Sequence, residues 1–188
     1  MTKQKNAIDF IGWLKSRKVE LIALMVSALL VVIDQITKLL VESNFQYVGE
    51  TLPIIKGVLN FTYIRNDGAV FGSLSGKPYI FNTITVIIVV LGVAALLLGK
   101  IKGKWLIWTA SLVIGGGIGN MIDRFRLKYV IDFIDVKLFG KLWVWVFNFA
   151  DCCVVVGCIM LIIYFVADTV KDVKKSKAQK ASKGDRDV

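Results

Sequence analysis

The sequence predicts a membrane protein built from four transmembrane helices, with strand-forming segments between them outside the membrane. Three observations lead to this fold class. The composition is 56% hydrophobic and only 20% charged, which is too apolar for an ordinary water-soluble domain. Four apolar runs are each long enough to cross a hydrocarbon core of roughly 30 Å. Two of the intervening segments are rich in β-branched and aromatic residues. We expect residues 1–188 to form a single membrane domain.

The first span is expected at residues 19–41. The basic segment 1–18 before it is typical either of an interfacial amphipathic helix or of a frayed terminus, and both interpretations stay open. Asp34 and Lys38 lie four residues apart near the end of the span, so both side chains project from one helix face and can pair. We expect this pair to support a site rather than to carry out chemistry itself.

Residues 43–78 are expected outside the membrane. Within them, 58–64 alternate partly between apolar and polar residues, which predicts a strand. Asn66 and Gly68 follow in a turn, because Gly68 can adopt a positive φ. Beside a membrane, this turn can place Asn66 over a bound peptide. The second span, 79–98, is almost entirely apolar and is expected to be scaffold.

The third span is expected at residues 105–122. Gly115 and Gly119 form a small-xxx-small pattern, which allows close approach of another helix. Asn120, Asp123 and Arg124 share one helix face at the end of this span. We expect Asp123 to stay ionised and paired beside Arg124, and therefore to serve the structure rather than to act as a general acid.

The second expected external segment is 124–147. Residues 128–136 read as a strand, and 142–147 as a returning strand or an interfacial segment. Asp132 is flanked by apolar residues, a setting that disfavours its charged form. Asp135, by contrast, is expected to be a solvated loop charge.

The fourth span, 148–166, opens with Asn148 and Asp151. The start of a helix favours an ionised Asp151, although a capping role alone would explain one of these two residues. All three cysteines lie in this run, where we expect small buried hydrophobes rather than a disulfide framework. The charged tail, 168–188, is expected to be disordered.

The distribution of positive charge predicts the orientation. Fifteen of the 24 lysines and arginines precede the first span, lie in the loop at 100–104 or follow Asp168, on the side that both termini share. The positive-inside rule places that side, including residues 1–18 and 168–188, in the cytoplasm. The net charge of +10 is therefore assigned to membrane orientation and not to nucleic acid. The polar motifs then converge on the outer face.

This convergence predicts a catalytic pair formed by Asp132 and Asp151. The chain contains no histidine, which excludes Ser-His-Asp triads, Cys-His pairs and His-Glu-x-x-His zinc sites. Two carboxylates held close together share a proton, so one activates water while the other donates a proton. We expect a site without metal or cofactor that acts on a peptide bond next to a bound transmembrane segment.

Two other functions are compatible with single features of the sequence. Ser73 and Lys77 could form a serine–lysine dyad, but Lys77 would have to be buried to lose its proton, and its neighbours suggest exposure. A proton-coupled transporter would also use membrane aspartates. Against it, the acidic residues gather at one rim, and the second and fourth spans offer no polar stripe for a pathway.

Five short motifs, in order along the chain, give it a specific resemblance to the bacterial lipoprotein signal peptidases (signal peptidase II). They are Asp34-Gln-x-Thr-Lys38, Asn66-x-Gly-Ala-x-Phe71, Gly119-Asn-x-x-Asp-Arg124, Val130-x-Asp-Phe133 and Phe147-Asn-x-Ala-Asp151. The resemblance implies an all-α membrane protein with four transmembrane helices and a small extracytoplasmic β-rich cradle. One departure is Trp145, where many members have proline.

The resemblance also implies an activity. Members are aspartic proteases of the bacterial cytoplasmic membrane that cleave the signal peptide from diacylglyceryl-modified prolipoproteins just before the lipidated cysteine. The implied partners are these prolipoproteins and membrane lipid, and we expect a monomer. The catalytic pair falls on Asp132 and Asp151. Other positions match residues that line, support or flank the site: Asp34, Lys38, Asn66, Gly68, Asn120, Asp123, Arg124 and Asn148.

Overall fold

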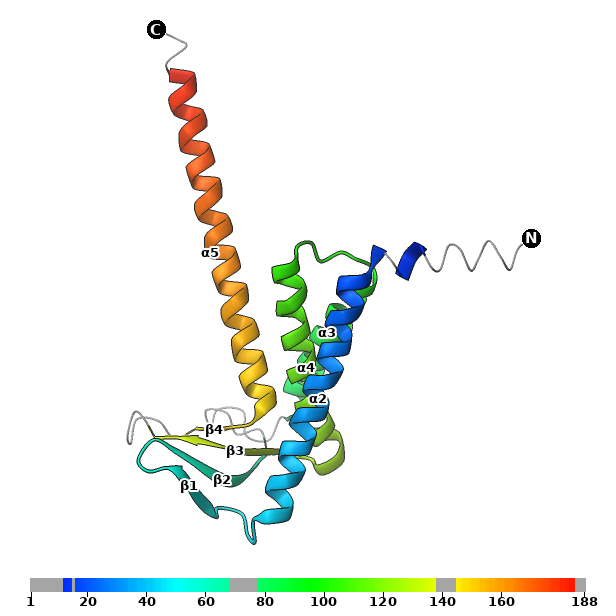
Figure 1. Ribbon diagram of the computed structural model, residues 1–188, viewed down its shortest axis with the longest axis vertical. Coiled ribbons are helices and arrows are strands. Elements are labelled where there is room, and N and C mark those ends of the chain that lie inside the picture. Colours follow the sequence, from blue (N-terminus) through cyan, green and yellow to red (C-terminus); the bar gives the residue numbers. More distant parts are fainter. Residues whose placement is uncertain (1–11, 15, 68–77, 138–144, 185–188) are drawn as a thin grey trace, which may run out of the picture.

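Four long helices and a small antiparallel sheet make up the structure, a computed structural model (Figure 1). It describes residues 12–14, 16–67, 78–137 and 145–184, with 78–82, 178 and 180–184 described by their backbone alone. Gly68 and the alternative pair Ser73 and Lys77 therefore lie outside the described residues.

The helices are α2 (Lys18–Asn44), α3 (Pro78–Leu97), α4 (Lys104–Leu127) and α5 (Phe149–Gly184). Among the described residues, three helical stretches are long and apolar enough to cross a membrane, namely Lys18–Asn44, Lys104–Leu127 and Phe149–Lys177. In the described part of α3 the apolar stretch is shorter, Thr83–Leu97. The expected total of four spans therefore stays a prediction.

Helix α5 corrects one expectation, because the tail that was expected to be disordered is helical as far as Gly184. Lysine and alanine are good helix formers, and extending an existing helix avoids the cost of nucleation. Figure 1 shows α5 rising from the sheet and extending beyond the other helices. Its three cysteines are free; Cys153 is buried as expected, but Cys152 and Cys158 are exposed, so the expectation of burial is wrong for these two.

The sheet has four strands in the order β1-β2-β3-β4, all antiparallel. The strands are β1 (Thr51–Ile55), β2 (Leu59–Asn66), β3 (Val130–Val136) and β4 (Val146–Phe147). The strands expected from the sequence at 58–64 and 128–136 correspond to β2 and β3. Strand β1 was not expected, since it is short and contains Pro53, which is tolerated mainly at a sheet edge. Residues 138–144 lie outside the described residues, so the expected returning strand is seen only as β4.

The sheet lies at the end of the helices where α2 ends and α5 begins (Figure 1), which we call the sheet end. An apolar cluster of Val41, Tyr63, Ile131 and Phe133 packs α2 against β2 and β3. This packing holds β3 against the ends of α2 and α4.

Helix α4 lies at the centre of the bundle and uses glycines to approach three other helices. A Cβ added at Gly115 or Gly119 would collide with α2, one at Gly116 with α5, and one at Gly117 with α3. The predicted close approach at Gly115 and Gly119 is therefore confirmed.

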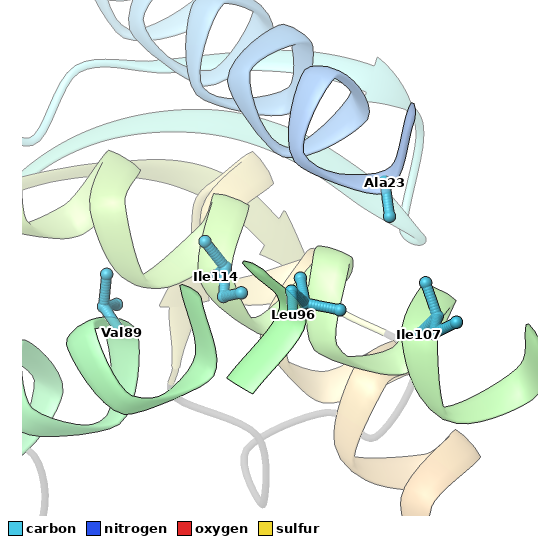
Figure 2. Close-up of a cluster of buried hydrophobic side chains, with 5 residues drawn as sticks. All are labelled: Ala23, Val89, Leu96, Ile107 and Ile114. Atoms are coloured by element: carbon cyan, nitrogen blue, oxygen red, sulfur yellow. The ribbon is translucent and has the colours of Figure 1, made fainter. Parts of the chain in front are cut away.

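A second cluster runs from the middle of the bundle to its far end, away from the sheet. It consists of Ala23, Val89, Leu96, Ile107 and Ile114, contributed by α2, α3 and α4 (Figure 2). The outward faces of the helices are also apolar: 72% of Met25 and 62% of Ile162 are exposed. Such faces suit contact with lipid.

Candidate active site

Asp132 and Asp151 line one cavity of about 560 Å³ at the sheet end. Asp132 comes from the middle of β3 and Asp151 from the first turn of α5. Asn66, Asn120 and Arg124, three of the expected site residues, line the same cavity. The fold thus brings together residues that are up to 85 positions apart in the sequence.

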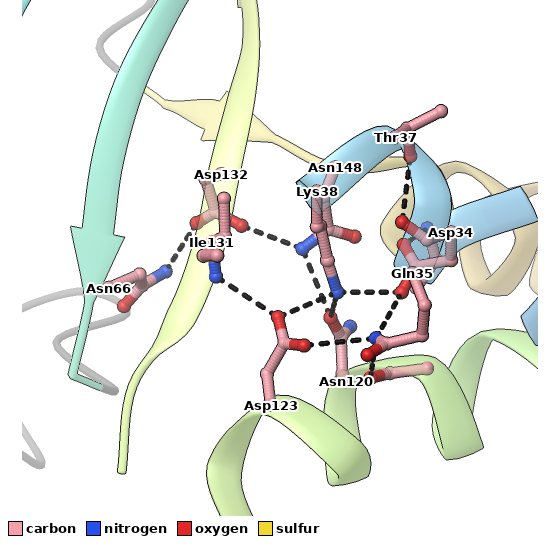
Figure 3. Close-up of polar contacts among 12 residues, drawn as sticks. Asp34, Gln35, Thr37, Lys38, Asn66, Asn120, Asp123, Ile131, Asp132 and Asn148 are labelled. Atoms are coloured by element: carbon pink, nitrogen blue, oxygen red, sulfur yellow. Dashed lines mark hydrogen bonds and ion pairs between the residues drawn. The ribbon is translucent and has the colours of Figure 1, made fainter. Parts of the chain in front are cut away.

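The Asp132 carboxyl is almost fully buried, with 2% of the residue exposed. Its Oδ2 accepts a hydrogen bond from Asn66 Nδ2 at 2.8 Å, and its Oδ1 accepts one from Asn148 Nδ2 at 2.7 Å (Figure 3). Burial, followed by the nearby charge of Asp151, raises the pKa of Asp132 to about 7. Asp132 can therefore hold a proton near neutral pH.

The Asp151 carboxylate has a different set of donors. Asn120 Nδ2 donates to Oδ1 at 2.7 Å, and the backbone N–H of Asn148 donates to Oδ2 at 3.3 Å. In return, the Asp151 N–H donates to Asn148 Oδ1 at 2.8 Å. This reciprocal pattern is a capping box, and together with the helix dipole it stabilises negative charge on Asp151. Asn148 and Asp151 therefore both take part in capping α5, and both also belong to the hydrogen-bonded network of the site.

Asn148 connects the two carboxyl groups. Its side chain is completely buried, and Nδ2 donates to Asp132 Oδ1 and, at 3.0 Å, to Asn120 Oδ1. Asn120 in turn donates to Asp151. Two asparagines thus form a continuous hydrogen-bonded path between the members of the expected pair.

A buried ionic cluster lies beside this path (Figure 3). The Lys38 ammonium is 2.8 Å from Asp34 Oδ2 and 3.0 Å from Asp123 Oδ2, and all three residues are at most 2% exposed. Lys38 also donates to Asn120 Oδ1 at 3.0 Å. The predicted pairing of Asp34 with Lys38 is confirmed. Asp123 pairs with Lys38 rather than with its neighbour Arg124, because the helix directs it toward α2.

The two acidic residues of this cluster also hold the elements that carry the pair. Asp34 Oδ1 accepts the backbone N–H of Ala150 at 2.9 Å, which ties α2 to the start of α5. Asp123 Oδ2 accepts the N–H of Ile131 at 3.1 Å, next to Asp132 on β3. Their contacts are those of supporting residues.

Two side chains differ from the expectations. The prediction that Asp135 is a solvated loop charge is wrong. Asp135 is 5% exposed, accepts a hydrogen bond from Thr62 Oγ1 at 2.8 Å and pairs with Lys137 at 2.8 Å. Burial acts to raise the pKa of Asp135, but the hydrogen bonds from Lys137 and Thr62 outweigh it and lower the pKa.

Gln35 was not assigned to the site, yet it belongs to the cluster. Its Nε2 donates to Asp123 Oδ1 at 2.9 Å and to the Gly119 carbonyl at 3.2 Å. The one signal in the sequence is its place next to Asp34 and three residues before Lys38. In the described part of the chain, no group of three or more acidic or cysteine side chains is arranged to hold a metal ion.

Comparisons with known proteins agree with one another. The profile of a family described as signal peptidase (SPase) II matches residues 26–167. The lipoprotein signal peptidase of Halothermothrix orenii is 40% identical over 141 residues, which cover 74% of this chain and 92% of the relative. That of Lactobacillus johnsonii is 36% identical over 157 residues, covering 84% and 99%. A solved structure described as a bacterial membrane enzyme superposes with a TM-score of 0.71 at 34% identity, covering 78% of this chain and 88% of that chain.

Proposed function

Because this chain belongs to the signal peptidase II family, we propose that it is an aspartic endopeptidase that matures lipoproteins. Its substrates are diacylglyceryl-modified prolipoproteins, and it cleaves each one just before the lipidated cysteine. The reaction uses the Asp132 and Asp151 carboxyl groups and requires no metal.

In this proposal all four helices, α2 to α5, cross the bacterial cytoplasmic membrane, with the sheet end on the outer surface. Two features support the arrangement. Among the described residues, most basic ones lie at 17–18, at 100–104 and in the last turns of α5, on the side opposite the sheet, where the positive-inside rule predicts cytoplasm. The polar residues of the site lie together near the sheet, at the depth where a transmembrane signal peptide would leave the membrane.

The observation that carries the proposal is the unequal environment of two carboxyl groups that line one cavity. Asp132 is buried with a pKa of about 7, whereas Asp151 lies in the first turn of a helix and accepts a backbone N–H. A pair with one protonated and one ionised member is what acid–base hydrolysis of an amide requires.

The proposed reaction proceeds in two steps. Asp151 removes a proton from a water molecule, whose oxygen attacks the scissile carbonyl carbon while Asp132 donates its proton to the carbonyl oxygen. The resulting tetrahedral diol then collapses: Asp132 takes back a hydroxyl proton, and Asp151 gives its proton to the departing amine. Both carboxyl groups end in their starting states, so no cofactor is consumed.

The remaining walls of the cavity fit such a substrate. They are formed mostly by apolar side chains of three helices, including Ile88 of α3, Val113 of α4 and Val154 of α5, and by residues of the sheet end such as Val146 and Phe147 of β4. These walls suit the apolar part of a signal peptide or the lipid chains. Asn66 and Arg124 line the cavity beside the pair and are proposed to hydrogen-bond carbonyl groups of the substrate.

The test replaces each carboxyl group by an amide of the same size. Asp132→Asn and Asp151→Asn should each lower kcat/KM for a purified diacylglyceryl prolipoprotein in detergent by about 100- to 10,000-fold, the usual contribution of a general acid or base. Asp135→Asn is the matched control, since Asp135 is also buried on β3 but bonds Thr62 and Lys137. Its activity should stay within about threefold of the original.

Near-normal turnover by a folded Asp132→Asn or Asp151→Asn protein would refute the proposal. A metal chelator should leave the rate unchanged, and loss of activity on chelation would contradict the metal-free mechanism.

A further inference from the structure

The side chains of two asparagines, Asn148 and Asn120, lie between the two carboxyl groups. The orientation of each asparagine amide is fixed by a neighbouring group that can only donate a hydrogen bond. The backbone N–H of Asp151 donates to Asn148 Oδ1, so the Nδ2 of Asn148 must point the other way, toward Asp132. The direction of this amide follows from the backbone of α5.

The same reasoning applies to Asn120. The Lys38 ammonium has no acceptor, so the Asn120 atom 3.0 Å away from it must be the oxygen, Oδ1. The nitrogen of the same amide then faces Asp151 Oδ1 at 2.7 Å. Figure 3 shows Lys38 and Asn148 both directed at Asn120. The Nδ2 of Asn148 is a neutral donor whose hydrogen bonding is shared between Asn120 and Asp132. The hydrogen bond from Lys38 to Asn120 is charge-assisted and therefore stronger.

We propose that Lys38 is a positioning residue that acts through Asn120 to keep Asp151 the ionised member of the catalytic pair. This inference rests on the proposed function. By holding and polarising the Asn120 amide, the ammonium strengthens the N–H that Asn120 donates to Asp151. If Asn120 turned over, its oxygen would face the Asp151 carboxylate, and the proton of the pair would be drawn to Asp151.

Other charges around Asp151 do not change in the variants chosen below. Arg124 faces it from α4 and Asp132 from β3, while its neighbour on α5 is the Cys152 thiol. The described side chains of α3, from Thr83 onward, include no charged group. On α2 the charged groups of the site are Asp34 and Lys38.

The test must remove the Lys38 donor without changing the net charge of the buried cluster, which also contains Asp34. The double variant Lys38→Met/Asp123→Asn does so, because it deletes one positive and one negative charge from the same ion pair. The control is Asp123→Asn alone, which keeps the bond from Lys38 to Asn120. The measurement is kcat/KM for diacylglyceryl prolipoprotein as a function of pH, and the position of the acid limb is compared between the variants.

We expect the acid limb of the double variant to move up by about one pH unit, because the ionised form of Asp151 loses part of its hydrogen bonding. The acid limb of Asp123→Asn should move by less than about a third of a unit, or slightly downward, since that variant removes only a negative charge. A double variant that is merely less active, with its acid limb unchanged, overturns the inference and leaves the proposed function intact.

Asn120→Ala provides the second measurement. It retains Lys38 and the whole ionic cluster, so it tests the path even if the double variant fails to fold. Its acid limb should also move up by about one pH unit, and an unchanged limb overturns the inference. Adding Asn120→Ala to the folded double variant should produce little further shift, because both changes interrupt the same path. Additive shifts would mean that Lys38 acts directly and not through Asn120.

Discussion

The sheet end and the far end of the helix bundle are both buried, but different interactions hold them together. At the far end, Leu96 and Ala23 are fully buried in an apolar cluster. At the sheet end, Lys38 and Asp34 are just as buried, yet their contacts are ion pairs and hydrogen bonds. The same helix, α2, contributes to both ends.

This contrast separates stability from function along a single helix. Apolar packing tolerates small changes of shape, whereas a buried polar network fails when one partner moves and leaves charges unpaired. Buried ion pairs are also no better for stability than good apolar packing. We infer that the sheet end keeps its polar network because the chemistry needs it, and that the far end is scaffold.

The largest difference between the two ends should appear when a methyl group is added to a glycine. In Gly119→Ala the new Cβ would lie 2.6 Å from Asp34 Oδ2 and 3.2 Å from Ala150 Cβ, so it displaces the carboxylate that anchors the start of α5. We expect kcat/KM to fall by about 100-fold or more, comparable to the loss of a general acid or base.

Gly92→Ala at the far end is the matched control. There the added Cβ meets only Cγ1 and Cδ1 of Ile114, each at 3.2 Å, so this side chain needs to shift by only a few tenths of an ångström. Its activity should remain within about twofold of the original protein. Equal losses in the two variants would show that the ends do not differ in this way.

The pH dependence of activity should show the second largest effect. Asp132 must hold its proton to act as the acid, and with a pKa of about 7 it loses that proton as the pH rises. We expect kcat/KM to decline about tenfold per pH unit above this value. A rate that stays flat from about pH 6 to about pH 9 would contradict the assignment.

The same pKa also predicts a change in stability. Folding raises the pKa of Asp132 from its ordinary value of 3.8 to about 7. The stability that Asp132 contributes is therefore complete below about pH 4 and is lost as the pH rises through 7. The unfolding temperature of Asp132→Asn should therefore change less between about pH 5 and about pH 8 than that of the original protein.

The smallest effect on activity should come from the far end. Leu96→Ala removes a fully buried side chain from the apolar cluster and should lower the free energy of unfolding by roughly 1–3 kcal/mol, less than in water because lipid competes as a solvent. Thermal unfolding in detergent measures this loss. We expect kcat/KM of the folded variant to stay within about twofold, and a large drop would show that the far end takes part in catalysis.

Local patterns predicted much of this molecule. The apolar runs located the helices, and the spacing of Asp34 and Lys38 predicted their ion pair. The strands β2 and β3 followed from β-branched and aromatic residues.

The contacts that the sequence could not supply are those between distant elements. Asp123 was expected to pair with Arg124, its neighbour in the chain, but packing of α4 on α2 brings it to Lys38. Asp135 looked solvated, because nothing near it in the sequence announces that Thr62 lies 2.8 Å away on β2. The periodicity of a sequence predicts which face of its helix or strand a side chain occupies. Only the fold shows which residues of other elements lie against that face.

The capping of α5 has a consequence for how the enzyme tolerates different bilayers. Asp34 of α2 binds the Ala150 N–H in its first turn, and Asn148, the residue directly before the helix, donates to Asn120 of α4 and Asp132 of β3. A slide of this helix and its cap along the axis by one residue would break these bonds to α2, α4 and β3. We therefore expect stretching or thinning of the surrounding lipid to be absorbed toward the opposite end of α5, so that the spacing of the reacting groups stays independent of membrane thickness.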